Sequence, residues 1–152
     1  MNRTMHGISS GARALGQAAK EADVFASVTA GDEDNLAACQ LAKAAFGQSF
    51  IGEAPVVIAA CGTEPKAIMA CGQPTYTVDV SIACAFMILQ AYELGLGTCW
   101  IGAFKEDEVK KILKIPEPIR VVALIPLGYP DEDPSQRARK DSDEIICLEK
   151  FE

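Results

Sequence analysis

Residues 95–104, with the sequence GLGTCWIGAF, have the types and spacing best suited to holding a ligand. Gly95 and Gly97 allow a tight reversal of the chain, because glycine tolerates backbone conformations that other residues avoid. The chain is then expected to become extended. There, Gly102 and Ala103 leave the backbone with almost no side-chain cover. A flat ligand can approach the N–H groups of such a stretch directly. The alternative interpretation is a helix end followed by a core strand.

Standard catalytic motifs do not occur in the sequence. It contains no G-x-S-x-G and no H-E-x-x-H, and His6 is its only histidine, which leaves no second histidine for a triad. The three glycines Gly95, Gly97 and Gly102 do not fit G-x-G-x-x-G, because the third comes too late. They also follow a predicted helix rather than a strand. We therefore assign no side chain to catalysis.

The cysteines and the charged residues exclude several kinds of site. We expect the six cysteines to be reduced and mostly buried, without a metal, because most lie in apolar runs and none forms a C-x-x-C pair. They are Cys39, Cys61, Cys71, Cys84, Cys99 and Cys147. The formal net charge of -7 argues against a nucleic-acid partner, which needs clustered cations. Cations do cluster at Arg137, Arg139 and Lys140, in an otherwise acidic tail.

The whole chain of 152 residues is expected to form one domain, with residues 1–31 as an atypical N-terminal region. We find no apolar run of the roughly 18 residues that a membrane span needs. The N-terminus also lacks the apolar core of a secretory signal. These features predict a cytoplasmic protein.

Helices and strands are predicted to alternate along the chain, which indicates an α/β or α+β fold. Alanine-rich and amphipathic patterns predict helices, and short apolar runs bounded by glycine or proline predict strands. The predicted helices are 12–22, 32–47, 77–94 and 105–113, and the predicted strands are 25–29, 55–62, 120–127 and a last extended segment, 144–151.

The helix predicted at residues 77–94 is apolar around nearly its whole circumference. Such a helix must be covered on most sides, either by its own domain or by a partner. An exposed surface of this kind on a monomer would favour association. We therefore expect a homodimer with a large apolar interface.

Three blocks of sequence resemble the C-terminal half of the nitroreductase family, in the order and spacing of that family. They are residues 77–117, 121–134 and 137–151, and the resemblance extends over about residues 32–152. It implies an α+β fold, an α/β-type sandwich whose central, mostly antiparallel sheet is flanked by helices. It also implies FMN bound at the interface of a homodimer.

The same resemblance assigns residues to the FMN site. Trp100, Ile101, Gly102 and Ala103 would line one face of the flavin, with the N–H groups of Gly102 and Ala103 toward N5 and O4. Arg139 and Lys140 would bind the FMN phosphate, although a solvated run of charges is the alternative for this pair. The arginine-rich phosphate segment that usually opens the family is not legible in residues 1–31, which suggests a truncated, frame-altered or diverged region.

Two functions are consistent with the sequence. The first is an FMN-dependent oxidoreductase that takes hydride from NADH or NADPH and reduces a nitroaromatic, a quinone or a similar small molecule. The flavin would carry the chemistry, which accounts for the missing acid–base motif. The second is a non-catalytic dimeric module that keeps the fold but has lost firm flavin binding.

Overall fold

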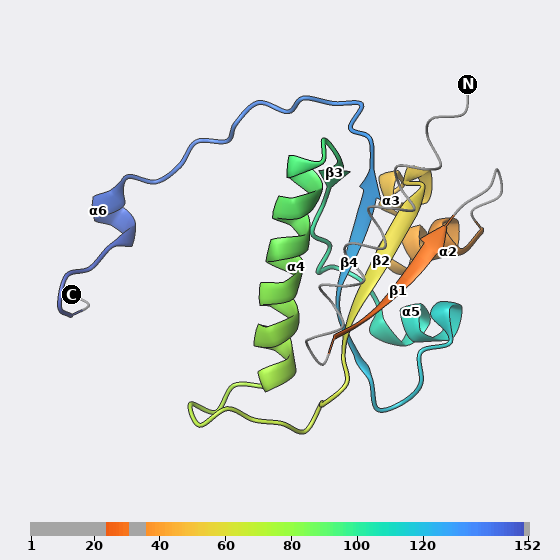
Figure 1. The fold of residues 1–152 in the computed structure, drawn as a ribbon, viewed down its shortest axis with the longest axis horizontal. Helices are drawn as coiled ribbons and strands as arrows, with labels where there is room; N and C mark the ends of the chain where they lie inside the picture. The colour runs from red at the N-terminus through yellow and green to blue at the C-terminus, as the bar shows by residue number, and fades with distance from the viewer. Residues whose placement is uncertain (1–23, 31–35, 151–152) are drawn as a thin grey trace.

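A computed structural model of the chain describes residues 24–30 and 36–150, and its centre is an antiparallel sheet (Figure 1). In the described part of the chain the sheet has four strands, in the order β1-β2-β4-β3, and every neighbouring pair is antiparallel. The strands are β1 (Val24–Ala30), β2 (Val56–Gly62), β3 (Gly97–Thr98) and β4 (Arg120–Gly128).

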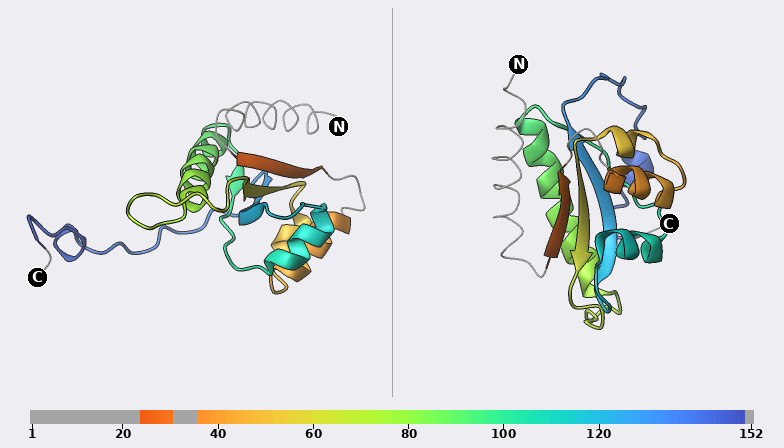
Figure 2. Two further views of the ribbon diagram at one scale, coloured as in Figure 1. Left: turned by 90° about the horizontal axis from the view of Figure 1, so that it is seen from below. Right: turned by 90° about the vertical axis from the view of Figure 1, so that its right-hand side faces the viewer.

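Helices cover both faces of this sheet (Figure 2). One face carries α2 (Leu36–Ala44), α3 (Phe50–Glu53) and α5 (Glu106–Leu113), and the other carries α4 (Thr75–Glu93). A further turn of helix, α6 (Ser142–Ile145), lies in a tail that leaves the body of the molecule. The fold is therefore α+β, with an antiparallel sheet flanked by helices, as the sequence predicted.

Strand β2 is buried over its whole length, because it lies between the two helical layers. Alternate side chains of a strand point to opposite faces. Val57, Ala59 and Cys61 accordingly pack with α2, α3 and α5. Val56, Ile58 and Ala60 pack with α4 on the other side.

A β-bulge interrupts the pairing of β2 with β4. Ala60 pairs with Ala123, but the next residue, Cys61, pairs with Val121, so that Val122 has no partner in β2. A bulge of this kind shifts the alternation of the strand by one residue. Leu124 and Val121, three positions apart, consequently both reach the core beneath α2 and α5.

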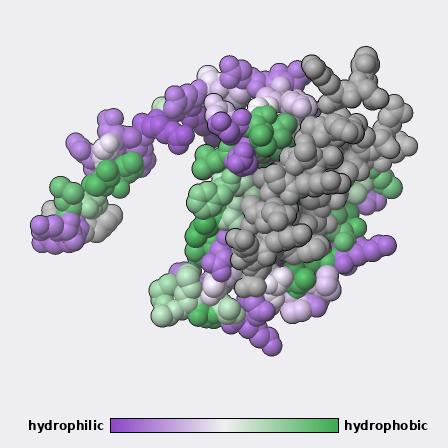
Figure 3. Space-filling view, viewed as in Figure 1, coloured by the Kyte–Doolittle hydropathy of each residue, from purple (hydrophilic) through white to green (hydrophobic). Residues whose placement is uncertain are grey.

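The outer side of α4 is apolar and exposed. Val80, Cys84, Met87 and Ala91 are buried against the sheet. The side chains that point away from the sheet include Val78, Ile82, Phe86, Leu89 and Tyr92, and all five are exposed. Figure 3 shows apolar surface along the edge of the body that α4 forms.

By length and composition α4 resembles a membrane span, with 19 residues and a mean hydropathy of 1.2. The sequence analysis found no uninterrupted apolar run of that length, and Asp79, Gln90 and Glu93 interrupt the apolar residues of α4. A helix that covers the sheet of a globular domain meets the same criteria, and the inner side of α4 packs in this way.

Two segments differ from the structure predicted for them, and a third lies among residues that the structure does not describe. Helix α3 was not predicted, because four residues are too few for a periodic pattern. The last segment, 144–151, was predicted to be extended, but its first two residues belong to α6, where Asp141 and Glu144 form a capping box. The predicted helix at 12–22 lies outside the described residues.

Candidate functional site

The chain between β3 and α5 runs beside β4 and is fixed to it at one point. Thr98 pairs with Leu127, and Ile101 then forms an isolated bridge with Leu124. The Ile101 N–H donates to the Leu124 carbonyl oxygen at 2.9 Å, and the Leu124 N–H donates back at 3.0 Å. The Ile101 side chain is buried, so this residue holds the segment against the sheet.

Immediately after this bridge, Gly102 and Ala103 present their backbone at the surface. Both residues are exposed, and neither N–H has an acceptor within residues 24–30 and 36–150. Within the part of the chain that the structure describes, a Cβ built on Gly102 would meet one atom, Trp100 Nε1, at 3.9 Å. The Trp100 side chain is 40% exposed. Two open N–H donors therefore lie beside an accessible aromatic ring, on a stretch of backbone with little side-chain cover.

Contacts from α2 and its following turn hold the far end of the segment. The Lys105 N–H donates to the Ala44 carbonyl oxygen at 2.9 Å. The Gln48 side-chain amide donates to the Ala103 carbonyl oxygen at 3.4 Å and to the Ala45 carbonyl oxygen at 3.0 Å. Sequence analysis did not single out Gln48, because nothing local relates it to residues 55 positions later.

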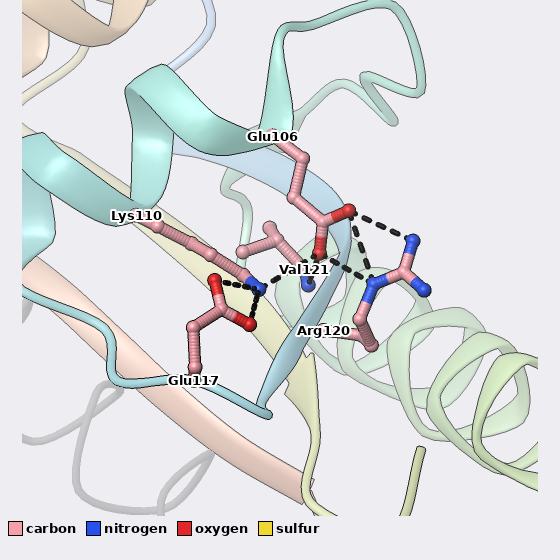
Figure 4. A network of polar contacts seen from close by, with 5 residues as sticks. All are labelled: Glu106, Lys110, Glu117, Arg120 and Val121. Carbon is pink, nitrogen blue, oxygen red and sulfur yellow. Dashed lines mark hydrogen bonds and ion pairs between the residues drawn. The ribbon is translucent and has the colours of Figure 1, made fainter. Parts of the chain in front are cut away.

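Glu106, the first residue of α5, ties that helix to the beginning of β4 (Figure 4). One of its carboxylate oxygens accepts the Val121 N–H at 2.8 Å. Both oxygens also accept hydrogen bonds from the Arg120 guanidinium, at 2.9 to 3.1 Å. An arginine–carboxylate pair with two parallel bonds is geometrically specific.

The charges around Glu106 continue into α5 and the loop that follows it. The Lys110 ammonium lies 3.7 Å from the Glu106 carboxylate and 3.0 Å from that of Glu117, and it is nearly buried. Burial raises the pKa of Glu106. The hydrogen bonds from Arg120 and Val121 and the charges of Arg120 and Lys110 outweigh this effect, so the net pKa is lowered. Glu106 is therefore ionised near neutral pH.

The two cations that the resemblance assigned to a phosphate lie elsewhere. Arg139 and Lys140 are exposed in the tail, and every residue from 129 to 150 is exposed. Figures 1 and 2 both show the tail leaving the body. One chain therefore brings Trp100, Gly102 and Ala103 together, but it does not bring Arg139 and Lys140 to them.

The cysteines are less buried than we expected. Cys61 and Cys84 are buried, and burial raises the pKa of their thiols to about 12 and about 11. Cys39, Cys71, Cys99 and Cys147 are exposed, because an apolar run places a side chain on the core only when its own face of the helix or strand points inward. All six are free thiols. No group of three potential metal ligands occurs among the described residues.

Comparison with known proteins adds the following. Residues 7–129 match the model of the family described as the nitroreductase family. The matched range begins inside residues 1–31, the region that looked atypical. A Methanothermobacter thermautotrophicus protein, provisionally named NADH dehydrogenase/NAD(P)H nitroreductase, is 38% identical over 109 residues. The match covers 68% of this chain and 54% of the relative. The chain spans about half the length of the curated relatives that it matches.

Solved structures show the same fold. An FMN-dependent nitroreductase from Clostridium difficile R20291 is 25% identical, with a TM-score of 0.74 over 93% of this chain and 88% of that one. A nitroreductase family protein from Clostridium novyi NT is 30% identical, with a TM-score of 0.68 over 80% of this chain and 74% of that one.

Proposed function

This chain belongs to the nitroreductase family, and from this premise we propose that it is an FMN-dependent oxidoreductase. It would take hydride from NADH or NADPH and reduce a small acceptor such as a nitroaromatic or a quinone. The observation that carries the proposal is the pair of open N–H donors at Gly102 and Ala103, beside the accessible Trp100 ring.

The site fits the edge of a flavin. Reduction of a flavin places negative charge on its N5–C4–O4 edge, and fixed N–H donors stabilise such charge without rearranging. Gly102 lets the ring approach, because among the described residues only the Trp100 Nε1 atom comes within 4 Å of a Cβ built there. Bound FMN would supply the hydride chemistry, so the site needs no ionisable catalytic side chain.

We propose that a second copy of the chain completes the site. The exposed side of α4 carries five large apolar side chains in one stripe, which is the feature expected of a homodimer interface. The tail adds Ile145, Ile146 and Leu148, which are also exposed. The tail that carries Arg139 and Lys140 leaves the body of its own chain, so we propose that these cations contact the FMN phosphate at the site of the partner chain.

The remaining parts of the proposal concern the surroundings of the protein. The net charge of -7 favours a small-molecule acceptor over a nucleic-acid partner. We further propose a cytoplasmic location, where NADH and NADPH are available.

Flavin titration tests this proposal directly. The purified protein should bind FMN, turn yellow and oxidise NADH or NADPH in the presence of a quinone or nitroaromatic acceptor. If the protein binds FMN but oxidises neither nucleotide, the proposed oxidoreductase activity is wrong. Protein that folds and dimerises without binding FMN indicates the non-catalytic module instead.

Repeating the titration with riboflavin tests the phosphate contact. A charged hydrogen bond is worth about 1.5–3 kcal/mol. The variant Arg139→Ala should therefore bind FMN about tenfold or more weakly. Riboflavin has no phosphate, so its affinity should barely change. Equal losses for both ligands, or no loss for either, exclude Arg139 from the phosphate site and leave the tail as a solvated run of charges.

A further inference from the structure

We propose that Glu106 is a positioning residue that sets where the Gly102 and Ala103 N–H groups lie against the flavin edge. This inference rests on the proposed function, because it gives Glu106 a role toward bound FMN. Glu106 does not touch the two N–H groups. It acts through the segment that carries them.

The segment between the anchors is short. Ile101 is fixed to β4 by two hydrogen bonds, and Lys105 is fixed to Ala44 by its N–H. Residues 102–104 lie between these points, and α5 begins at the next residue, Glu106. Three residues between fixed ends have few available conformations. The position of the first turn of α5 therefore contributes to how Gly102 and Ala103 are presented, together with the Gln48 side chain that bonds to the Ala103 carbonyl oxygen.

Glu106 fixes that first turn to the sheet. The bulge at Val122 shifts the alternation of β4 by one residue. The Val121 N–H donates to the Glu106 carboxylate. The carboxylate thus takes the place of a strand neighbour, and it continues the attachment that Ile101 makes to Leu124. Bulges often redirect backbone groups close to functional sites.

Arg120 fixes the orientation of the Glu106 carboxylate. Its guanidinium binds both Glu106 oxygens and also lies over the Tyr76 ring, 5.9 Å from the ring centroid. Tyr76 stands in the first turn of α4. The Glu106 carboxylate is thereby held in register with β4 and with the helix on the opposite face of the sheet.

An acidic residue at the start of a helix often has only a dipole role, and the first turn of α5 contains examples. Asp107 is exposed and has no ion-pair partner in the described part of the chain. Glu108 pairs with Lys105 on the surface at 3.0 Å, within the same turn. Glu106 differs from both because it bonds to another element of the fold.

The experiment compares Glu106→Ala with the matched control Asp107→Ala. Both variants remove one carboxylate from the same turn, so their net charges are equal. FMN and 5-deaza-FMN are titrated against each protein, because the deaza analogue has no hydrogen-bond acceptor at position 5. The parent should prefer FMN. The preference should fall by about threefold to tenfold in Glu106→Ala, the range expected for one neutral hydrogen bond, and remain unchanged in Asp107→Ala. A loss of overall stability would weaken the binding of both flavins equally and leave the preference for FMN over 5-deaza-FMN unchanged.

Hydrogen exchange of the flavin-free proteins supplies a second measurement. The Lys105 and Ile101 amides should exchange about tenfold faster in Glu106→Ala than in the parent or in Asp107→Ala. Without the Glu106 carboxylate the segment between these two amides is less firmly attached to β4 and opens more often. Glu106→Gln keeps an acceptor for Val121 but loses its charge, so it should fall between the parent and Glu106→Ala. It also replaces the alanine variant if that protein does not fold.

The outcomes separate the inference from the proposed function. The role of Glu106 is overturned if the parent binds and prefers FMN but Glu106→Ala and Glu106→Gln leave either the flavin preference or the amide exchange unchanged. The proposed function remains intact in that case. A parent that binds no flavin overturns the proposed function and the role toward FMN. Exchange at Lys105 still shows in that case whether Glu106 anchors the segment.

Discussion

At the scale of single residues, the site depends more on an absent side chain than on a reactive one. Gly102 has no positive φ, and an added Cβ would stand in open space beside Trp100. Substitution there should not strain the backbone, so an effect on ligand binding can be separated from an effect on folding.

We expect Gly102→Val to weaken FMN binding while the fold is retained, because a branched side chain occupies the space of the flavin edge. Loss of one hydrogen bond predicts a decrease of about two- to tenfold, and steric contact adds to it. Gly102→Ala should have a smaller effect. Affinity is measured by flavin titration and folding by circular dichroism. The control is Gly52→Ala, where the new Cβ meets ordinary contacts. Unchanged FMN binding in Gly102→Val would show that the assigned contact is wrong.

At the scale of elements, the attachment of α5 to β4 is an ion pair with a backbone hydrogen bond. The Glu106 side chain is only 24% exposed, so it is less accessible to solvent than either member of the surface pair of Lys105 and Glu108. The cost of removing Glu106 therefore includes a backbone N–H that loses its partner.

The lowered pKa of Glu106 predicts a contribution to stability that depends on pH. The folded pKa lies below the unfolded value, so the contribution is present above the unfolded pKa and is lost as the pH falls through the folded pKa. The free energy of unfolding should therefore decrease less in Glu106→Gln than in the parent between neutral pH and about pH 3. Urea unfolding at several pH values measures this, with Asp107→Asn as the control. Parallel curves for parent and Glu106→Gln would contradict the prediction.

At the scale of the whole molecule, the α4 stripe leaves a large apolar surface without cover in one chain. Phe86 is at its centre and is 68% exposed, so its side chain contributes little to the core of its own chain. The stripe runs along the helix at the spacing of one face, with Val78, Ile82, Phe86 and Leu89 in succession.

We expect the parent to be a dimer at micromolar concentration and Phe86→Glu to be a folded monomer, because a charge buried at an apolar interface loses its hydration. Dimer affinity should fall by at least about tenfold, as measured by light scattering over a dilution series. Leu36→Glu serves as the control, since that exposed side chain lies on α2, on the opposite side of the sheet. A stable parent monomer would contradict the proposed dimer.

The sequence by itself was sufficient for the parts of the molecule that local patterns determine. Strand β2 and helix α4 were predicted within two residues of their observed ends, because a continuous apolar run and a long apolar helix are properties of neighbouring residues. The open backbone at Gly102 and Ala103 was also predictable, since glycine has no side chain and alanine only a methyl group.

Only the tertiary structure decided which distant groups meet. Sequence analysis did not single out Glu106, because its bonds to Arg120 and Val121 join residues 14 and 15 positions apart. The bulge at Val122 that allows them is a property of the pairing of two strands and not of either sequence. The exposure of Cys39 and Cys71 depends in the same way on which helix or loop face packing turns outward. The direction in which the tail leaves the body depends on packing too. Local sequence sets which residues can form an element, but the register between elements is fixed by contacts that no local pattern contains.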